Sequence, residues 1–220
     1  MADLKAAVLI SGRGSNLQAL IEACANPDYP AEIVLVISNK PKAMGLKRAR
    51  KAGIDVRIID HRDFDSREDY DESITQALEA AGTELVCLAG FMRVLGESFV
   101  ERWRDRVINI HPSLLPAFKG LNTHERAIDA GIRITGCTVH FVRPAMDDGP
   151  IIVQAAVPVL PEDDAKILAD RILVAEHKCY PMAVRLIAEG RARVVNEKVS
   201  FDGAEPAEGL LINPRDDTAR

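Results

Sequence analysis

The stretch AAVLISGRGSNLQALIEAC, residues 6–24, decides the fold class. Its first five residues are apolar, as in a buried strand, and they run into a glycine-rich turn at residues 11–16. The apolar residues that follow recur at the three-and-four spacing of one helix face: Leu17, Leu20, Ile21 and Cys24. The stretch therefore predicts a buried strand, a glycine loop and a helix in succession.

The same alternation continues through the first half of the chain. Apolar, β-branched runs predict strands at residues 33–37, 56–59 and 85–89. Helices are expected at residues 43–52 and from the capping residue Ser66 to Gly82. This rhythm predicts an α/β fold with a mostly parallel, open, twisted sheet, helices on both faces and a Rossmann-like N-terminal half.

The second half is less regular. Strands are expected at residues 107–110, 136–142 and 151–159, and a short helix at residues 123–130. A long helical stretch covers residues 163–189, and Pro181 should kink or split it near Tyr180.

Composition limits the function classes. The 220 residues include 28 basic and 33 acidic side chains, a formal charge of −5, which disfavours a general nucleic-acid binder. No apolar run approaches the roughly 20 residues of a membrane span, and residues 1–10 lack the pattern of a signal peptide. The four cysteines show no C-x-x-C spacing and the five histidines are scattered, so no metal site is expected. We expect a cytoplasmic protein without membrane or nucleic-acid partners.

The glycine loop indicates an anion site. Backbone N–H groups at the start of a helix that follows a strand bind phosphate well, which makes Gly14, Ser15 and Asn16 candidate donors. A dinucleotide fingerprint would need a small residue in place of Leu17 and an acidic residue at the end of the second strand, so no nicotinamide cofactor is expected. The alternative is a tight turn of small residues that binds nothing.

A second polar cluster begins at the end of the predicted strand 107–110. Asn109 and His111 share one side of that strand and can polarise a carbonyl or hold an oxyanion. Asp147 or Asp148, in a later loop, offers a carboxylate partner. In the alternative interpretation these residues cap a loop, fill a semi-buried position and form turns.

Several motifs taken together resemble the folate-dependent phosphoribosylglycinamide formyltransferases. They run in that family's order from about residue 5 to 195, nearly the whole chain. The motifs are ISGRGSNLQA (10–19), SNK (38–40), FDSRE (64–68), LAGFMR (88–93), NIHPSLLP (109–116), GCTVHFV (136–142), Glu176-His177 and Tyr180-Pro181.

The resemblance implies roles for individual residues. Gly14, Ser15 and Asn16 would hold the phosphate of glycinamide ribonucleotide, and Glu176 its ribose or neighbouring polar groups. The pocket for the cosubstrate 10-formyltetrahydrofolate would be formed by Arg67, Met92, Arg93, Val94, Leu95 and Asn109. The catalytic set would be Asn109, His111 and Asp147. Two departures from the family pattern, Asp148 beside Asp147 and the residues Lys119 and Asn122, leave the contribution of those side chains open.

The implied activity is formyl transfer to the ribonucleotide amine in de novo purine biosynthesis, by direct amine attack. The implied organisation is one formyltransferase domain at residues 1–195, with a phosphate-binding half (about 1–100), a catalytic half (about 101–195) and a polar C-terminal tail at 196–220. We expect a monomer or homodimer. The alternatives are a hydrolase that releases formate from the same folate, a formyltransferase for another amine, and a non-catalytic nucleotide-binding module.

Overall fold

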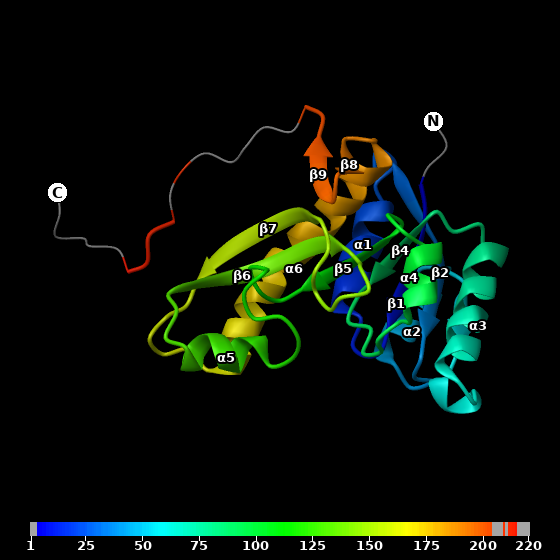
Figure 1. Ribbon diagram of the computed structural model, residues 1–220, viewed down its shortest axis with the longest axis horizontal. Coiled ribbons are helices and arrows are strands. Elements are labelled where there is room, and N and C mark those ends of the chain that lie inside the picture. Colours follow the sequence, from blue (N-terminus) through cyan, green and yellow to red (C-terminus); the bar gives the residue numbers. More distant parts are fainter. Residues whose placement is uncertain (1–3, 204–208, 210, 215–220) are drawn as a thin grey trace.

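The computed structural model describes residues 4–203, 209 and 211–214 (Figure 1). The strands of its main sheet are β1 (Leu4–Ile10), β2 (Ala31–Ser38), β3 (Val56–Ile58), β4 (Leu85–Leu88), β5 (Val107–His111), β6 (Ile134–Phe141) and β7 (Ile151–Pro158). The α-helices are α1 (Ser15–Cys24), α2 (Met44–Lys51), α3 (Arg67–Ala80), α4 (Glu97–Arg102), α5 (Thr123–Asp129) and α6 (Ala165–Ala188). A two-stranded hairpin, β8 (Ala192–Val195) and β9 (Lys198–Phe201), follows α6.

The main sheet has the strand order β3-β2-β1-β4-β5-β6-β7. Strands β1 to β5 pair in parallel, whereas β6 and β7 are added as antiparallel strands. The expected mostly parallel, open sheet is therefore confirmed. The strand order reverses direction between β1 and β4, and ligands of open α/β sheets bind beyond the carboxyl ends of the strands at such a point.

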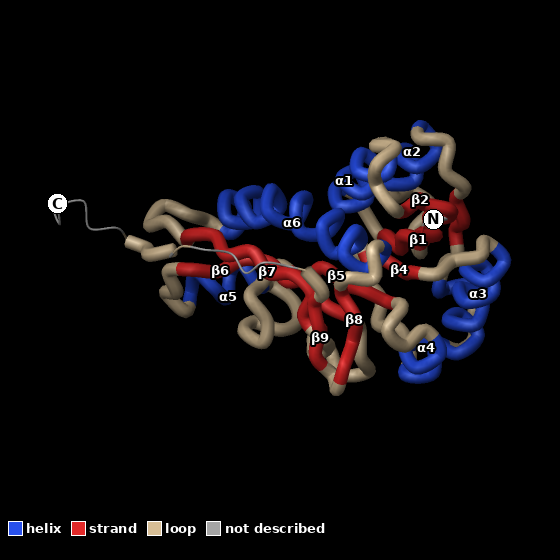
Figure 2. The backbone as a smooth tube through the Cα atoms, turned by 90° about the horizontal axis from the view of Figure 1, so that it is seen from above, coloured by secondary structure: helices blue, strands red, loops and turns tan. Residues whose placement is uncertain are grey.

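Helices cover both faces of the sheet, as expected. One apolar core joins alternate sheet residues to α1, α2 and α6, and a second joins the opposite residues to α3 and α4. Figure 2 shows α1, α2 and α6 on one side of the strands and α3 and α4 on the other. Because both faces are covered, β1 is buried along almost its whole length and reads as a continuous apolar run.

The cap expected at Ser66 is present. Its hydroxyl accepts a hydrogen bond from the Asp69 N–H group (3.0 Å) and starts α3 at the next residue. This cap fixes where Arg67 stands, at the first position of the helix.

Three elements differ from the expectations. Helix α6 runs without a break across Pro181, so the split near Tyr180 is wrong, and the alternative of a kink stays a prediction. Cys179, Tyr180, Ala183 and Val184 are all buried, and the packing of this helix against the sheet compensates for the lost backbone hydrogen bond. Helix α4 was not anticipated. The hairpin β8–β9 crosses residue 195, where we place the end of the domain, and that division stays a prediction.

Candidate active site

The loops that follow β1, β2 and β4 meet at the carboxyl edge of the sheet. The Ser11 N–H group donates to the Gly90 carbonyl (3.1 Å), and the Ser11 hydroxyl donates to Asn39 Oδ1 (2.7 Å). The same hydroxyl accepts from the Met92 N–H group (2.8 Å). Ser11 thereby fixes the glycine loop against the segment that begins at Met92.

The glycine loop has the geometry of an anion cradle. Gly14 precedes α1 with φ +69°, in the left-handed region that glycine occupies without strain. A Cβ added to Gly14 would lie 2.7 Å from the Gly45 Cα, because the loop packs directly against the start of α2. At the N-terminus of α1, Ser15 is half-buried and Asn16 is buried, and the first turn of the helix carries no acidic residue that would oppose an anion.

Asn16 and Glu176 are brought together from opposite ends of the chain. The Asn16 amide donates from Nδ2 to Glu176 Oε2 (2.7 Å), and both side chains are buried. Helices α1 and α6, which carry them, lie side by side in Figures 1 and 2. Asn16 Oδ1 is buried without a hydrogen-bond partner among the described residues, so a ligand donor would satisfy it. Burial raises the pKa of Glu176, against the opposing effects of the Asn16 bond and of His111.

Asn109 faces His140 across the antiparallel strands β5 and β6. The two residues are direct register partners, and Asn109 Nδ2 lies 3.4 Å from His140 Nε2. His140 Nδ1 lies 2.9 Å from the Phe141 carbonyl oxygen, which requires a proton on Nδ1. Burial lowers the pKa of His140, so the ring is neutral and its Nε2 accepts from Asn109. The amide is thereby oriented, and its second N–H group is left for a ligand.

His111 and Asp147 form the second part of this cluster. His111 Nδ1 lies 3.4 Å from Asp147 Oδ2, and His111 Nε2 lies 3.0 Å from the Phe118 carbonyl oxygen. Both ring nitrogens face oxygens, and the protonated ring satisfies both as a donor. Asp147 Oδ2 also accepts from the Gly120 N–H group (2.8 Å), and Asp147 Oδ1 lies 3.9 Å from His140 Nε2.

Two of the three residues that depart from the family pattern, Lys119 and Asp148, contact each other. The Lys119 ammonium group donates to Asp148 Oδ1, and both side chains are exposed. This ion pair holds the pKa of Asp148 below its usual range. Asp147 rather than Asp148 reaches His111, which selects between the two carboxylates that the sequence left open. Asn122 takes a left-handed conformation (φ +54°) immediately before α5.

The segment expected to line the folate pocket is exposed and held at both ends. Met92, Arg93 and Val94 are exposed, whereas Leu95 is buried. After Leu95, the Gly96 N–H group donates to the buried Asp71 Oδ2 (2.7 Å). Arg67 is exposed beside this turn: a Cβ added to Gly96 would lie 3.5 Å from Arg67 Cδ.

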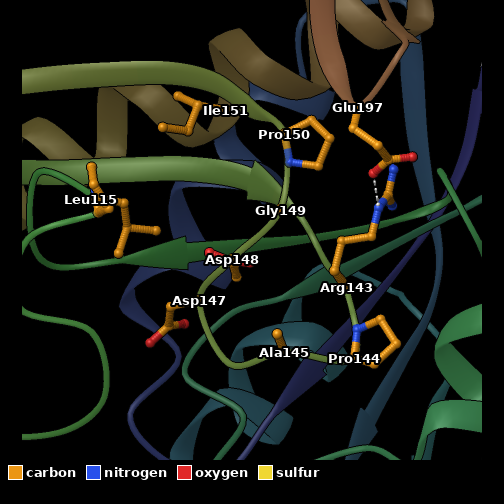
Figure 3. A pocket seen from close by; sticks show the side chains of 11 residues that line it. Leu115, Arg143, Pro144, Ala145, Asp147, Asp148, Gly149, Pro150, Ile151 and Glu197 are labelled. Atoms are coloured by element: carbon orange, nitrogen blue, oxygen red, sulfur yellow. Dashed lines mark hydrogen bonds and ion pairs between the residues drawn. The ribbon is translucent and has the colours of Figure 1, made fainter.

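A cleft of about 710 Å³ flanks the loop that carries Asp147 (Figure 3). Its lining is Leu115, Pro116, Arg143, Pro144, Ala145, Asp147, Asp148, Gly149, Pro150, Ile151 and Glu197. Within the described part of the chain, no group of three His, Cys, Asp or Glu side chains could hold a metal ion. Of the helices in that part, none has both the length and the apolar composition for crossing a bilayer.

Sequence reasoning missed His140 as a site residue. It was counted among scattered histidines, yet it orients Asn109. The available signal was its place with Thr138 on one face of the strand at residues 136–142. The pairing of that strand with β5 brings His140 opposite Asn109, and the sequence pattern alone does not contain this pairing.

Fold and site together define a Rossmann-like α/β protein with an anion cradle and an amide–imidazole–carboxylate cluster at the carboxyl edge of its sheet. A family model described as formyl transferase matches residues 4–184. Phosphoribosylglycinamide formyltransferase from Haemophilus influenzae is 43% identical over 199 residues, which cover 90% of this chain and 94% of that protein. The crystal structure of glycinamide ribonucleotide transformylase 1 from Symbiobacterium toebii aligns with TM-score 0.88 and 45% identity, over 90% of this chain and 94% of that one.

The chain therefore belongs to the formyl transferase family, in its phosphoribosylglycinamide formyltransferase group. It is also 50% identical over 191 residues to the trifunctional purine biosynthetic protein adenosine-3 of Gallus gallus. That match covers 87% of this chain and 19% of the longer protein, so the chain spans about a fifth of the length of such relatives.

Proposed function

We propose that the protein transfers the formyl group of 10-formyltetrahydrofolate to the amine of glycinamide ribonucleotide, a step of de novo purine biosynthesis. The observation that carries the proposal is the position of Glu176. Its Oε2 accepts a hydrogen bond from Asn16, at the start of the helix that follows β1. The register Leu9–Leu88–Asn109 across β1, β4 and β5 puts the cluster of Asn109 and His111 at the same edge of the sheet, which supports one substrate reaching both.

The ribonucleotide is bound at the glycine loop. Its phosphate accepts from the N–H groups of Gly14, Ser15 and Asn16 at the start of α1. Its ribose or neighbouring polar groups contact Glu176, and a donor from it satisfies Asn16 Oδ1. The folate lies against Met92, Arg93, Val94 and Leu95, with Arg67 at the edge of this pocket.

The substrate amine attacks the formyl carbon directly. A new C–N bond forms while the bond from that carbon to the folate nitrogen breaks, and the proton lost by the amine balances the proton gained by the departing nitrogen. Asn109 donates to the oxyanion that develops on the formyl oxygen, through the N–H group that His140 does not use.

His111 supplies charge and a proton. As an imidazolium between Phe118 and Asp147 it stabilises the oxyanion or protonates the departing nitrogen. The Nδ1 to Asp147 separation of 3.4 Å is longer than an ordinary hydrogen bond of about 2.9 Å, so a substrate atom or a water can take over this contact. Asp147 orients the ring.

An absorbance assay of the folate product tests the proposal. We expect the deformylated folate to form only when both the formyl-folate and the ribonucleotide are present. One molecule of formylated ribonucleotide should form for each molecule of deformylated folate. Folate release without the ribonucleotide would instead identify a hydrolase, and ligand binding without turnover would identify a binding module. The full chain should be assayed beside His111→Ala, which binds the ribonucleotide but does not turn it over.

The remaining assignments are part of the same proposal. The protein acts in the cytoplasm as a monomer or homodimer, with its two small-molecule substrates as partners and without nucleic acid. Residues 1–195 form the formyltransferase domain, and the polar segment 196–220 follows it.

A further inference from the structure

The loop that carries Asp147 is held from outside the matched family region. Arg143, four residues before Asp147, is buried, yet it is a permanent cation. Its Nη2 donates to Asp105 Oδ1 (2.6 Å) and its Nε donates to Glu197 Oε2 (2.7 Å). Glu197 belongs to the turn between β8 and β9, beyond residues 4–184 that the family model matches.

The network continues to one more cation. Glu197 Oε1 accepts from Arg104 Nη2 (2.7 Å), and Arg104 Nη1 also donates to Glu101 (2.9 Å). Both partners of Arg143 stand in the left-handed region, Asp105 at φ +58° and Glu197 at φ +57°. Such backbone strain persists where surrounding contacts fix it, and here both residues aim a carboxylate at one guanidinium.

Arg143 is one of three anchors that determine where Asp147 lies. At the returning end of the loop, a Cβ on Gly149 would meet the Phe141 carbonyl oxygen at 1.7 Å, so this end packs directly on β6. In the middle, Asp147 itself accepts from Gly120. At the outgoing end, Arg143 reaches the hairpin, and Figure 3 shows its guanidinium directed at Glu197, away from Asp147.

We propose that Glu197 is a positioning residue for the catalytic loop: through Arg143, the hairpin β8–β9 holds residues 143–150 so that Asp147 meets His111. The expected change in kcat rests on the proposed function. The contact between Glu197 and Arg143, and its effect on the position of the loop, do not depend on it. Glu197 touches neither Asp147 nor His111, so its effect passes through Arg143.

The test compares Glu197→Ala in the full chain with Glu101→Ala, which removes a carboxylate from Arg104 and leaves Arg143 bonded to Glu197. We expect Glu197→Ala to lower kcat about 10-fold with the KM for the ribonucleotide unchanged, because a small displacement of a catalytic group is costly. Glu197→Gln keeps an acceptor for Arg143 and should recover most of this loss. Glu101→Ala should match the wild type.

Two further measurements separate positioning from general stability. Amide hydrogen exchange of residues 145–149 should accelerate in Glu197→Ala and stay unchanged in Glu101→Ala, while the helices keep their protection. In a double-mutant cycle, adding Glu197→Ala to the Arg143→Ala variant should not lower kcat further.

Wild-type kcat in Glu197→Ala, or unchanged exchange at residues 145–149, overturns the inference. Additive losses from the Arg143 and Glu197 variants also overturn it. If the wild-type chain shows no formyl transfer, the proposed function fails, and the exchange measurement still decides the role of Glu197.

Discussion

Asn109 lies directly opposite His140 in the antiparallel pairing of β5 and β6, with 3.4 Å between Asn109 Nδ2 and His140 Nε2. The histidine is fixed in one tautomer by the Phe141 carbonyl, so a neutral ring presents a lone pair to the amide. A strand pairing thus determines which way the Asn109 amide points.

Replacing Asn109 by Ala should lower kcat by about 100- to 1000-fold, the usual cost of removing one oxyanion donor. The fold should persist, since the Asn109 side chain is only half-buried. Steady-state kinetics with both substrates measure the change, and Asn26→Ala, at a turn far from the cluster in sequence, is the control. Turnover within a few-fold of the wild type would remove Asn109 from the mechanism.

Replacing His140 by Leu should reduce kcat by about 10-fold, less than the Asn109 change, because the amide stays but loses its orientation. Burial lowers the pKa of His140, which also predicts a smaller protonated fraction of this ring than of an ordinary histidine at the same pH. Nitrogen-15 chemical shifts of the ring across a pH titration report this directly. A protonated Nε2 at neutral pH would contradict the assigned hydrogen bond.

Replacing Gly14 by Ala should weaken both stability and ribonucleotide binding. A side chain in the left-handed region costs about 1–3 kcal/mol of unfolding free energy, and the added carbon meets Gly45 at 2.7 Å. Denaturant unfolding and the KM for the ribonucleotide measure the two effects. Gly12→Ala is the matched control, because a Cβ there meets nothing within 4 Å and its φ is not positive.

Asp163 should make the unfolding free energy sensitive to acid. Its carboxylate accepts from Arg171 at 2.5 and 2.7 Å, and this pairing lowers the pKa of Asp163 from 3.8. A lowered folded-state pKa means that the stabilisation is complete above pH 3.8 and is lost as the pH falls below it.

The Asp163→Asn variant should therefore lose about 1–3 kcal/mol of unfolding free energy at pH 7, and the difference from the wild type should shrink toward pH 2. Denaturant unfolding at several pH values tests this. Asp170→Asn, which breaks an exposed pair with Lys166 on the same helix, should change little. A difference that stays constant down to pH 2 would contradict the assigned pKa direction.

Local patterns predicted most elements of the parallel half of the molecule, with α4 as an exception. The apolar run before Ser11 and the small residues after it dictate a buried strand and a tight turn in any context, and Ser66 caps its helix through contacts within three residues. The resemblance assigned Asn16 and Glu176 to different groups of one substrate, whereas the hydrogen bond between them was not predicted.

The features that could not be predicted depend on contacts distant in sequence. His140 becomes a site residue only through its register with Asn109 across 31 positions. Helix α6 tolerates Pro181 because the residues around this proline are buried against the sheet. Local helix propensity cannot predict that burial. Glu197 holds Arg143 across 54 positions, from a turn whose left-handed residues carry no glycine signal.

The hydrogen bond between Asn16 and Glu176 spans 160 positions, so its two ends leave the ribosome far apart in time. The glycine loop is made together with the first strand, whereas the carboxylate that accepts from Asn16 comes with α6, much later in the chain. A nascent or C-terminally shortened chain without α6 therefore lacks the acceptor for the Asn16 amide, because the two side chains meet only where α6 packs beside α1.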